Sequence, residues 1–431
     1  MPPKAASPSP PPGNPVTRFL WQSGGLVAGR AASLLGLFLI FGDLGQERYG
    51  RFVVLLALLE LAVAPWKMTP WQSAAAGLGR GASHGSWIVT MATWWAVGTL
   101  VLGPIIWVFA GPDATVVFAV TSAANGWMTE HIPGHLLAGR QRKIALGMVG
   151  SQLARLGFIG GAMALGLLTP TVAILIHGLG YLVGVVLLWT PRTRGDGRLG
   201  PMLPEVGTEA LTWVEVHGPV IVVAVLLGLS TAGGFDLLYR VAAAVAELIG
   251  GVGLILLPNL IAGTKPGPVV ARGLRLPTAG AALLGIAFAL AAAPVLEAAL
   301  DVDLEFGLAP ALLAVTMVLA PWMGVTKATL LTHGGVRWIL PSQIATSGAT
   351  MAASAAASHG IVWAAAAIAL GHVAGAAVRW WGMRAVDALP VASDVFSARR
   401  LTSDVAQLPG LLRGGKPEGD QPAAEGSPGH P

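Results

Sequence analysis

Most of this chain consists of apolar runs long enough to cross a lipid bilayer, and this feature limits its fold more than any other. A spanning helix needs about 20 predominantly apolar residues. Hydrophobic types make up 54% of the 431 residues and charged types only 11%, whereas soluble domains carry about 25% charged residues. Too few charges remain to cover a water-exposed surface. We therefore predict an all-α, multi-pass membrane protein.

The apolar runs fall into two sets of six, which predicts about twelve transmembrane helices in two lobes. The first set covers 19–42, 50–66, 86–110, 113–138, 144–168 and 170–190, and the second covers 217–232, 235–262, 276–300, 308–332, 338–358 and 360–384. The predicted organisation is a disordered tail 1–18, an N-lobe 19–190, a linker 191–216, a C-lobe 217–384 and a second disordered tail 385–431.

Basic residues alternate between the predicted connections, as cytoplasmic loops require. The basic connections contain Lys67 and Arg80; Arg140, Arg142 and Lys143; Arg192, Arg194 and Arg198; Lys265, Arg272 and Arg275; and Arg337. Only Arg48 and Arg51 depart from this pattern. We expect both termini on the cytoplasmic side of the cytoplasmic membrane. The net charge of +5 is then explained by these loops and does not indicate nucleic-acid binding.

Two short stretches suggest that the lobes are repeats of one unit. "FAVTSAANGWM" at 118–128 matches "LAVTMVLAPWM" at 313–323 in Ala-Val-Thr and Trp-Met. These stretches lie in the fourth and tenth predicted spans, so the two halves would share one orientation. A pseudo-two-fold axis along the membrane normal would relate them, as in transporters built from parallel repeats.

Several ionisable residues lie inside the predicted spans, where a charge at the bilayer centre costs about 2.5–3.5 kcal/mol on insertion scales. They are Arg30, Glu60, Glu130, Arg155, Arg240, Glu247 and Lys327. So many charges cannot all face lipid. We expect them to face one another, water or a ligand in a cleft between the lobes.

The stretch "GGFDLLYRVAAAVAELIGGVGLILLP" at 233–258 carries three such groups on one helix. Asp236 and Arg240 are one turn apart and can pair, and Glu247 lies two turns further along the same face. The pair is equally compatible with a structural tie between helices.

Two roles are predicted for these residues. Arginines suit an anionic head group such as a phosphate or pyrophosphate, because guanidinium binds it through two parallel hydrogen bonds. The predicted substrate-binding residues are Arg30, Arg155, Arg240, Lys327, Asn125 and Gln152, and the candidates for Na⁺ or H⁺ coupling are Glu60, Glu130, Glu247 and Asp236. For any single glutamate, a hydrogen bond between helices is the alternative role, and for Asn125 and Gln152 the alternative is a hydrogen bond to neighbouring backbone.

Familiar catalytic signatures are missing from the sequence. It contains no P-loop, no H-E-x-x-H and no G-x-S-x-G, and it has no cysteine for thiolate metal ligands. We therefore expect a membrane transporter without a cofactor or metal centre, and not an enzyme. A membrane-embedded glycosyltransferase or ligase is the alternative from another class, and a new covalent product would identify it.

Several stretches resemble polysaccharide flippases of the multidrug/oligosaccharidyl-lipid/polysaccharide exporter superfamily. They are "LFLIFGDLGQERYGRFVVLLALLELA" at 37–62, "LLYRVAAAVAELIGGVGLILLPNL" at 237–260, "LEFGLAPALLAVTMVLAPWMGVTKATLLTHGGVRWIL" at 304–340 and "ASHGIVWAAAAIAL" at 357–370. The first contains the Leu-Gly-x-x-x-Tyr-Gly turn between spans 1 and 2.

The resemblance implies a two-lobed flippase that moves a polyprenyl-pyrophosphate-linked oligosaccharide across the cytoplasmic membrane by alternating access. It also implies cavity arginines, which would here be Arg30, Arg155 and Arg240, and a partnership with polysaccharide polymerase or glycosyltransferase machinery. The shortened stretch "LSTAGGFD" departs from the family pattern at spans 7 and 8. A cation-coupled small-molecule exporter of the same superfamily is the alternative function.

Overall fold

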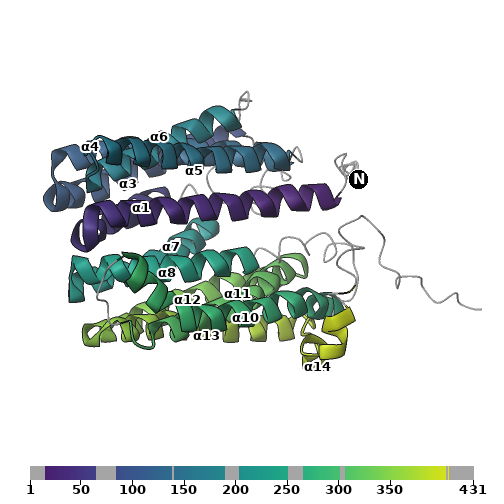
Figure 1. The fold of residues 1–431 in the computed structure, drawn as a ribbon. Coiled ribbons are helices and arrows are strands. Elements are labelled where there is room, and N and C mark those ends of the chain that lie inside the picture. The colour runs from purple at the N-terminus through teal and green to yellow at the C-terminus, as the bar shows by residue number, and fades with distance from the viewer. Residues whose placement is uncertain are drawn as a thin grey trace, which may run out of the picture.

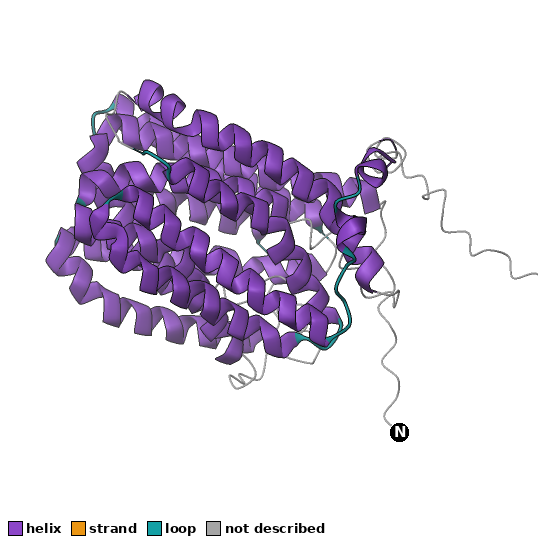
Figure 2. Cartoon of the chain, turned by 90° about the horizontal axis from the view of Figure 1, so that it is seen from below, coloured by secondary structure: helices purple, strands orange, loops and turns teal. Residues whose placement is uncertain are grey.

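The computed structural model describes residues 15–64, 84–137, 140–189, 203–250, 266–300, 306–403 and 406. Within these ranges the regular structure is helical and no strand occurs (Figure 2). Figure 1 shows two helical bundles lying side by side. This arrangement confirms the predicted all-α fold.

The N-lobe and the C-lobe are the two bundles of Figure 1. The N-lobe contains α1 (Pro15–Val63), α3 (His84–Ala110), α4 (Pro112–Leu137), α5 (Gln141–Ala164) and α6 (Pro170–Leu188). The C-lobe contains α7 (Leu203–Leu227), α8 (Leu229–Gly250), α10 (Pro266–Leu300), α11 (Ala309–Thr332), α12 (Ile339–Ser354) and α13 (Ile361–Ala385), with the short elements η3 (Val336–Trp338), η4 (Ala355–His359) and α14 (Ala392–Val395).

Large apolar side chains on the outside of the bundles identify the surface that lipid would cover. Val108 is 87% exposed, Val225 77% and Leu290 74%. Seven of the described helices are long and apolar enough to cross a membrane; they lie in α1, α5, α6, α7, α10, α11 and α13. Polar side chains such as Thr121 and Ser342 are fully buried between helices instead. This distribution is that of a multi-pass membrane protein.

Predicted spans 1 and 2 form a single helical run that breaks at one residue. Gly45 has φ 72° and ψ 171°, and helical backbone continues on both sides of it. Glycine adopts this left-handed conformation without a steric penalty. The sequence predicted a gap at 43–49, but the observed break is much shorter.

The boundaries predicted for spans 7 and 8 differ most from the structure. The sequence indicated 217–232 and 235–262, whereas α7 runs from Leu203 to Leu227 and α8 (Leu229–Gly250) begins at Leu229. Residues 251–262 of the predicted span 8 lie outside the described residues. Gly228, with φ 93°, separates the two helices. The first residues of α7, 203–216, were assigned to the linker instead.

The segment after α13 also differs from the predicted disordered tail, of which 386–403 is described. Ala388 is fully buried and packs with Val270, Leu274 and Met383 in a second apolar cluster. The predicted tail 1–18 also differs, because α1 begins at Pro15. Residues 1–14, 191–202, 404–405 and 407–431 lie outside the described residues.

The two lobes repeat one packing pattern. In the N-lobe α3 packs on α4, α4 on α6, α5 on α6 and α1 on α5. In the C-lobe the equivalent helices form the same pairs, α10 on α11, α11 on α13, α12 on α13 and α7 on α12. The matching sequence stretches lie on the equivalent helices α4 and α11. The packing therefore supports the internal repeat of six helices.

Glycines bring α12 and α13 into close contact. A Cβ added at Gly371 would collide with the Thr350 hydroxyl oxygen, and one added at Gly375 with that of Thr346. Small residues four apart allow helices to approach in this way. The contact fixes the register of α13 on α12 and thereby the positions of their buried polar side chains.

We predict that Gly375→Ala destabilises the C-lobe, because the new methyl group must displace Thr346 and overpacking costs about 1–3 kcal/mol. Thermal unfolding in one detergent measures the effect as a lower apparent Tm. Gly348→Ala on α12 is the matched control, since its Cβ would meet open space. Equal Tm values for the two variants would contradict the close packing.

Candidate functional site between the two lobes

The lobes meet through α1 on one side and α7 and α8 on the other. Tyr49 and Asp236, Gln46 and Ser230, and Ala57 and Trp213 are hydrogen-bonded pairs across this contact. Most of the predicted site residues that the structure describes lie on these helices or on α5 and α6 behind them.

The lobes touch backbone to backbone near the reversal of α1 at Gly45. A Cβ on Gly50 would collide with the carbonyl oxygen of Leu229, and one on Gly233 would lie 2.6 Å from the carbonyl oxygen of Gln46. The Ser230 hydroxyl donates to Gln46 Oε1 at 3.0 Å. We call the contact formed by Gln46, Gly50, Leu229 and Gly233 the seal. By the charge pattern of the loops, it lies at the predicted outer end.

Asp236 lies directly below the seal and receives two donors. Arg240 Nε lies 2.6 Å from Asp236 Oδ2, and the Tyr49 hydroxyl donates to the same oxygen at 3.2 Å. Asp236 is 1% exposed, so its charge is compensated only by these neighbours. The predicted pairing of Asp236 with Arg240 is confirmed, and Tyr49 extends it to the N-lobe. Arg240 Nη2 has no hydrogen-bond partner among the described residues.

A second charged pair joins the lobes at a lower level. Arg30 of α1 forms a salt bridge with Glu247 of α8. Glu247 follows Asp236 by about 16 Å along α8, at about 1.5 Å per residue. The two side chains are 43% and 46% exposed, in contrast to buried Asp236. Asp236 and Glu247 of α8 thus both bond to side chains of α1, while Arg240 bonds to Asp236 on its own helix.

Arg155 occupies the interior of the N-lobe. It is 6% exposed, its guanidinium carbon lies 4.0 Å from the centre of the Tyr181 ring, and Nη1 donates to Gln152 Oε1 at 3.2 Å. A Cβ at Gly180 would collide with the Arg155 side chain, so this glycine leaves room for it. Arg155 Nε and Nη2 have no hydrogen-bond partner among the described residues.

A small pocket adjoins Arg155 between α1, α5 and α6. Gln152, Ser33 and His177 supply its other polar side chains, and it has room for about one water molecule. Tyr181 links Arg155 to Glu60, because its hydroxyl donates to Glu60 Oε1 at 3.3 Å. His177 lies within electrostatic reach of Arg155, Glu60 and Arg240. These groups form one polar centre that extends from the N-lobe to the lobe contact.

The remaining predicted residues lie elsewhere. Asn125 is buried in α4, with no hydrogen-bond partner for Nδ2 in the described part of the chain. Lys327 is half-buried in α11 of the C-lobe. Glu130 belongs to α4, but its side chain lies outside the described residues. The structure thus places Arg30, Arg240, Glu247 and Asp236 at the lobe contact, and it does not gather every predicted residue there.

Sequence reasoning missed a polar cluster inside the C-lobe. Gln343 Nε2 donates to Glu215 Oε2 at 2.5 Å, and His372 Nε2 lies 3.2 Å from Glu215 Oε1. The assignment of Glu215 to the linker concealed it, and His372 was not among the predicted site residues. Three polar residues at mid-helix positions were the available signal. Among the described residues, no group of three or more His, Cys, Asp or Glu side chains could hold a metal ion.

Comparisons with known proteins find similarity of fold only. No protein-family model and no curated protein sequence matches the chain. Lipid II flippase MurJ in an inward closed conformation has TM-score 0.64 and 11% identity, covering 92% of each chain. An outward-facing multidrug resistance MATE family transporter of the MOP superfamily has TM-score 0.60 and 13% identity, covering 88% of this chain and 98% of that one.

A third solved structure, the eukaryotic MATE transporter AtDTX14, has TM-score 0.57 and 11% identity, covering 91% of this chain and 99% of that one. Coverage is nearly complete in each case, so the likeness includes both lobes. The chain therefore has the two-lobed fold of these transporters.

We predict that Gly50→Ala loosens the seal, because its methyl group cannot coexist with the Leu229 carbonyl at the present distance. Overpacking costs about 1–3 kcal/mol. The ratio of the sealed to the open state should therefore fall roughly tenfold. The measurement is the maleimide labelling rate of a single cysteine introduced as Ser230→Cys in the cysteine-free chain.

Gly42→Ala on the same helix is the control for this experiment, since nothing lies within 4 Å of its Cβ. It should leave the labelling rate unchanged. An unchanged rate in Gly50→Ala as well would show that the seal does not limit access.

Proposed function

We propose that this chain is an alternating-access transporter of the cytoplasmic membrane that moves a polyprenyl-pyrophosphate-linked oligosaccharide to the outer leaflet. The observation that carries the proposal is the exposed salt bridge between Arg30 and Glu247, which joins the lobes on the side away from the seal. The fold likeness to the lipid II flippase supports the substrate class, because that protein has a similar arrangement of lobes.

The exposure of the Arg30–Glu247 pair limits how strongly this salt bridge can hold the lobes together. At 43% and 46% exposure, such an ion pair contributes only about 0–1 kcal/mol of stability. It therefore cannot hold the lobes together against a ligand of higher charge. A pyrophosphate offers Arg30 more acceptor oxygens than Glu247 does, and guanidinium binds phosphate through paired hydrogen bonds. We infer that the head group takes Arg30 from Glu247 and separates the lobes at this level.

Arg240 can extend the binding site towards the seal. Its Nη2 is without a partner among the described residues, while Nε remains bonded to Asp236. A head group held by Arg30 and then by Arg240 would advance along α8 towards Tyr49 and the seal. Opening of the seal would release it outward, while the polyprenyl tail stays in the membrane.

Arg155 has a different role in this proposal. It is buried among N-lobe helices beside a pocket of about one water molecule, so it cannot contact a pyrophosphate in this conformation. Its unpaired guanidinium nitrogens add positive potential to the polar centre. We infer that Arg155 attracts the anionic head group without being its first contact.

A cation-coupled exporter of small molecules is the second candidate. MATE transporters are among the similar structures, including a multidrug resistance protein. Acidic Glu60 lies in the polar centre and Glu247 at the lobe contact, where either could bind a cationic drug. Efflux of a cationic dye in an ion gradient, without movement of the glycolipid, would favour this function.

We predict opposite effects for the two members of the salt bridge. Arg30→Gln should weaken binding of a fluorescent polyprenyl-pyrophosphate oligosaccharide roughly tenfold or more, since a charged hydrogen bond contributes about 1.5–3 kcal/mol. Glu247→Gln should strengthen binding by up to roughly fivefold, because it removes a competitor worth about 0–1 kcal/mol. Titration in nanodiscs measures both, and proteoliposomes measure translocation.

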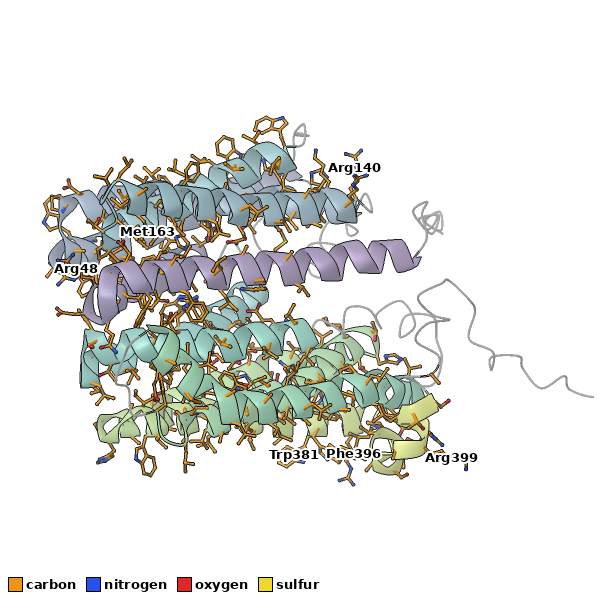
Figure 3. All side chains as sticks on the ribbon, viewed as in Figure 1. Arg48, Arg140, Met163, Trp381, Phe396 and Arg399 are labelled. Carbon is orange, nitrogen blue, oxygen red and sulfur yellow. The ribbon has the colours of Figure 1, made fainter. Side chains whose placement is uncertain are left out.

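Arg48→Gln is the matched control, because this arginine of α1 is exposed at the end where the helix reverses (Figure 3). It should bind the lipid as the wild type does. If Arg30→Gln and Glu247→Gln both weaken binding equally, the pair is only a structural tie. If the wild type moves no such lipid above empty vesicles, the glycolipid proposal fails.

A further inference from the structure

The residues that follow α13, 386–403, pack on the C-lobe, and we call them the C-terminal segment. Leu389 and Val395 pack against the apolar cluster that contains Val270 of α10. A Cβ added at Gly267, the second residue of α10, would lie 3.1 Å from the Leu389 carbonyl oxygen. The segment therefore runs closely over the start of α10, and the C-lobe covers one of its faces.

Hydrogen bonds within the C-terminal segment maintain two helical turns. The N–H of Phe396 donates to the Ala392 carbonyl at 3.0 Å, which closes α14. The N–H of Arg400 donates to the Ser397 hydroxyl at 3.3 Å, so that Ser397 caps the helical turn that follows. Arg400 also forms a salt bridge with Asp394 at 2.7 Å. These bonds fix which side chains of the segment point away from the C-lobe.

The uncovered face of the C-terminal segment carries large apolar side chains. Phe396 is 75% exposed and Val391 63%. Trp381, in the last turns of α13, is also exposed, and Figure 3 shows Trp381 and Phe396 on the same outer side of the C-lobe. Several large apolar side chains gathered on one surface indicate contact with a membrane or a partner.

This exposed face continues the lipid-facing surface of α13. Trp363, Leu370 and Trp381 are all exposed and follow one another after 7 and 11 residues. These intervals are close to two and three helical turns, so the three side chains lie on one face of the helix. Trp residues gather where a spanning helix leaves the membrane. The C-terminal segment begins directly after Trp381 and therefore lies at the level of the lipid head groups.

Exposed arginines surround the apolar side chains. Arg384 and Arg399 have no ion-pair partner among the described residues. Arg337 is exposed in η3, which contacts α13. Asp387 is the exposed acid between them, since Asp394 is paired with Arg400. The cations are in excess, and apolar side chains beside arginine are typical of segments that lie in the membrane interface.

We propose that the C-terminal segment is a binding site for anionic phospholipid of the cytoplasmic leaflet. The acyl chains contact Trp381, Val391 and Phe396, while Arg384 and Arg399 bind the negatively charged head group. The site lies on the outer side of the C-lobe and takes a lipid of the bilayer, not the transported molecule. Because the segment packs on α10 and follows α13, a bound lipid holds this end of the C-lobe at the membrane surface.

Charge favours an anionic lipid over the other possible occupants of this surface. A zwitterionic head group carries its own cation, which the arginines repel, whereas an anionic one leaves its phosphate charge for them. A second copy of the chain is less suited, because the same patch meets itself in a two-fold dimer. Two sets of exposed arginines would then come together.

The test is quenching of a fluorophore on the C-terminal segment by spin-labelled lipids. Exposed Ala392 is changed to cysteine and labelled with a nitrobenzoxadiazole dye, and the absence of native cysteine leaves no background. The full chain is placed in nanodiscs of phosphatidylcholine and phosphatidylglycerol, and one of the two lipids at a time carries a nitroxide on its acyl chain. Both should quench the dye, and spin-labelled phosphatidylglycerol should quench it more strongly.

Removal of the arginines should abolish this preference for the anionic lipid. Arg384→Gln and Arg399→Gln should each lower it by up to roughly fivefold, as expected for one cation near an anionic surface. High salt should also weaken it, because it screens exposed charges. Arg140→Gln is the matched control, since Figure 3 shows Arg140 at the same end of the molecule as Arg399 but on the other lobe. It should leave the preference unchanged.

Three results would overturn the proposal. Equal quenching by the two lipids would show that the surface does not select an anionic head group. Quenching by neither would show that the segment lies away from the bilayer or is covered by protein. A preference that persists in the double variant Arg384→Gln, Arg399→Gln would exclude these arginines. All the substituted side chains are exposed, so the variants should fold, and no glycolipid is present, so the outcomes are independent of the transported substrate.

Discussion

The contact of α1 with α8 is the interaction on which the rest of the structure depends. It joins two lobes that repeat one packing pattern, and one apolar core cluster contains residues of both. At the seal, glycines allow backbone to touch backbone, and away from the seal the contact also contains polar pairs such as Arg30–Glu247. In lipid there is little hydrophobic force between helices, so close packing and polar pairs determine association. A contact built in this way can be broken at one end while it holds at the other.

The two lobes share their packing but differ in the polar groups at their centres. In the N-lobe, Arg155 lies between Tyr181 and Gln152 and carries excess positive charge. In the C-lobe, the Glu215 carboxylate lies between Gln343 and His372. In the proposed function, the N-lobe centre attracts the anionic head group.

Local features of the site could be predicted from the sequence, because they depend on periodicity. The pairing of Asp236 with Arg240 and the common face of Glu247 follow from helical spacing. The reversal near Gly45 follows from its turn residues. The contacts of Arg30 with Glu247 and of Glu215 with His372 join distant parts of the chain, and no spacing rule brings them together. Glu215 was also missed because residues 191–216 were assigned to the linker.

The all-α fold with two lobes was predictable for a different reason. Long apolar runs and alternating basic loops limit a chain to a few membrane topologies, so the all-α fold followed even where single boundaries were wrong. The C-terminal segment shows the limit of this reasoning. Its composition suggested disorder, yet Ala388 is buried against α10 through neighbours that only the fold supplies.

The most direct test of the central claim is a cryo-electron microscopy structure of the chain in nanodiscs with a polyprenyl-pyrophosphate oligosaccharide. We predict pyrophosphate density against Arg30 between α1 and α8, with Glu247 no longer paired to Arg30. A bound lipid on the outer surface of the bundles, with the Arg30–Glu247 salt bridge intact, would contradict the role of the lobe contact as the substrate site.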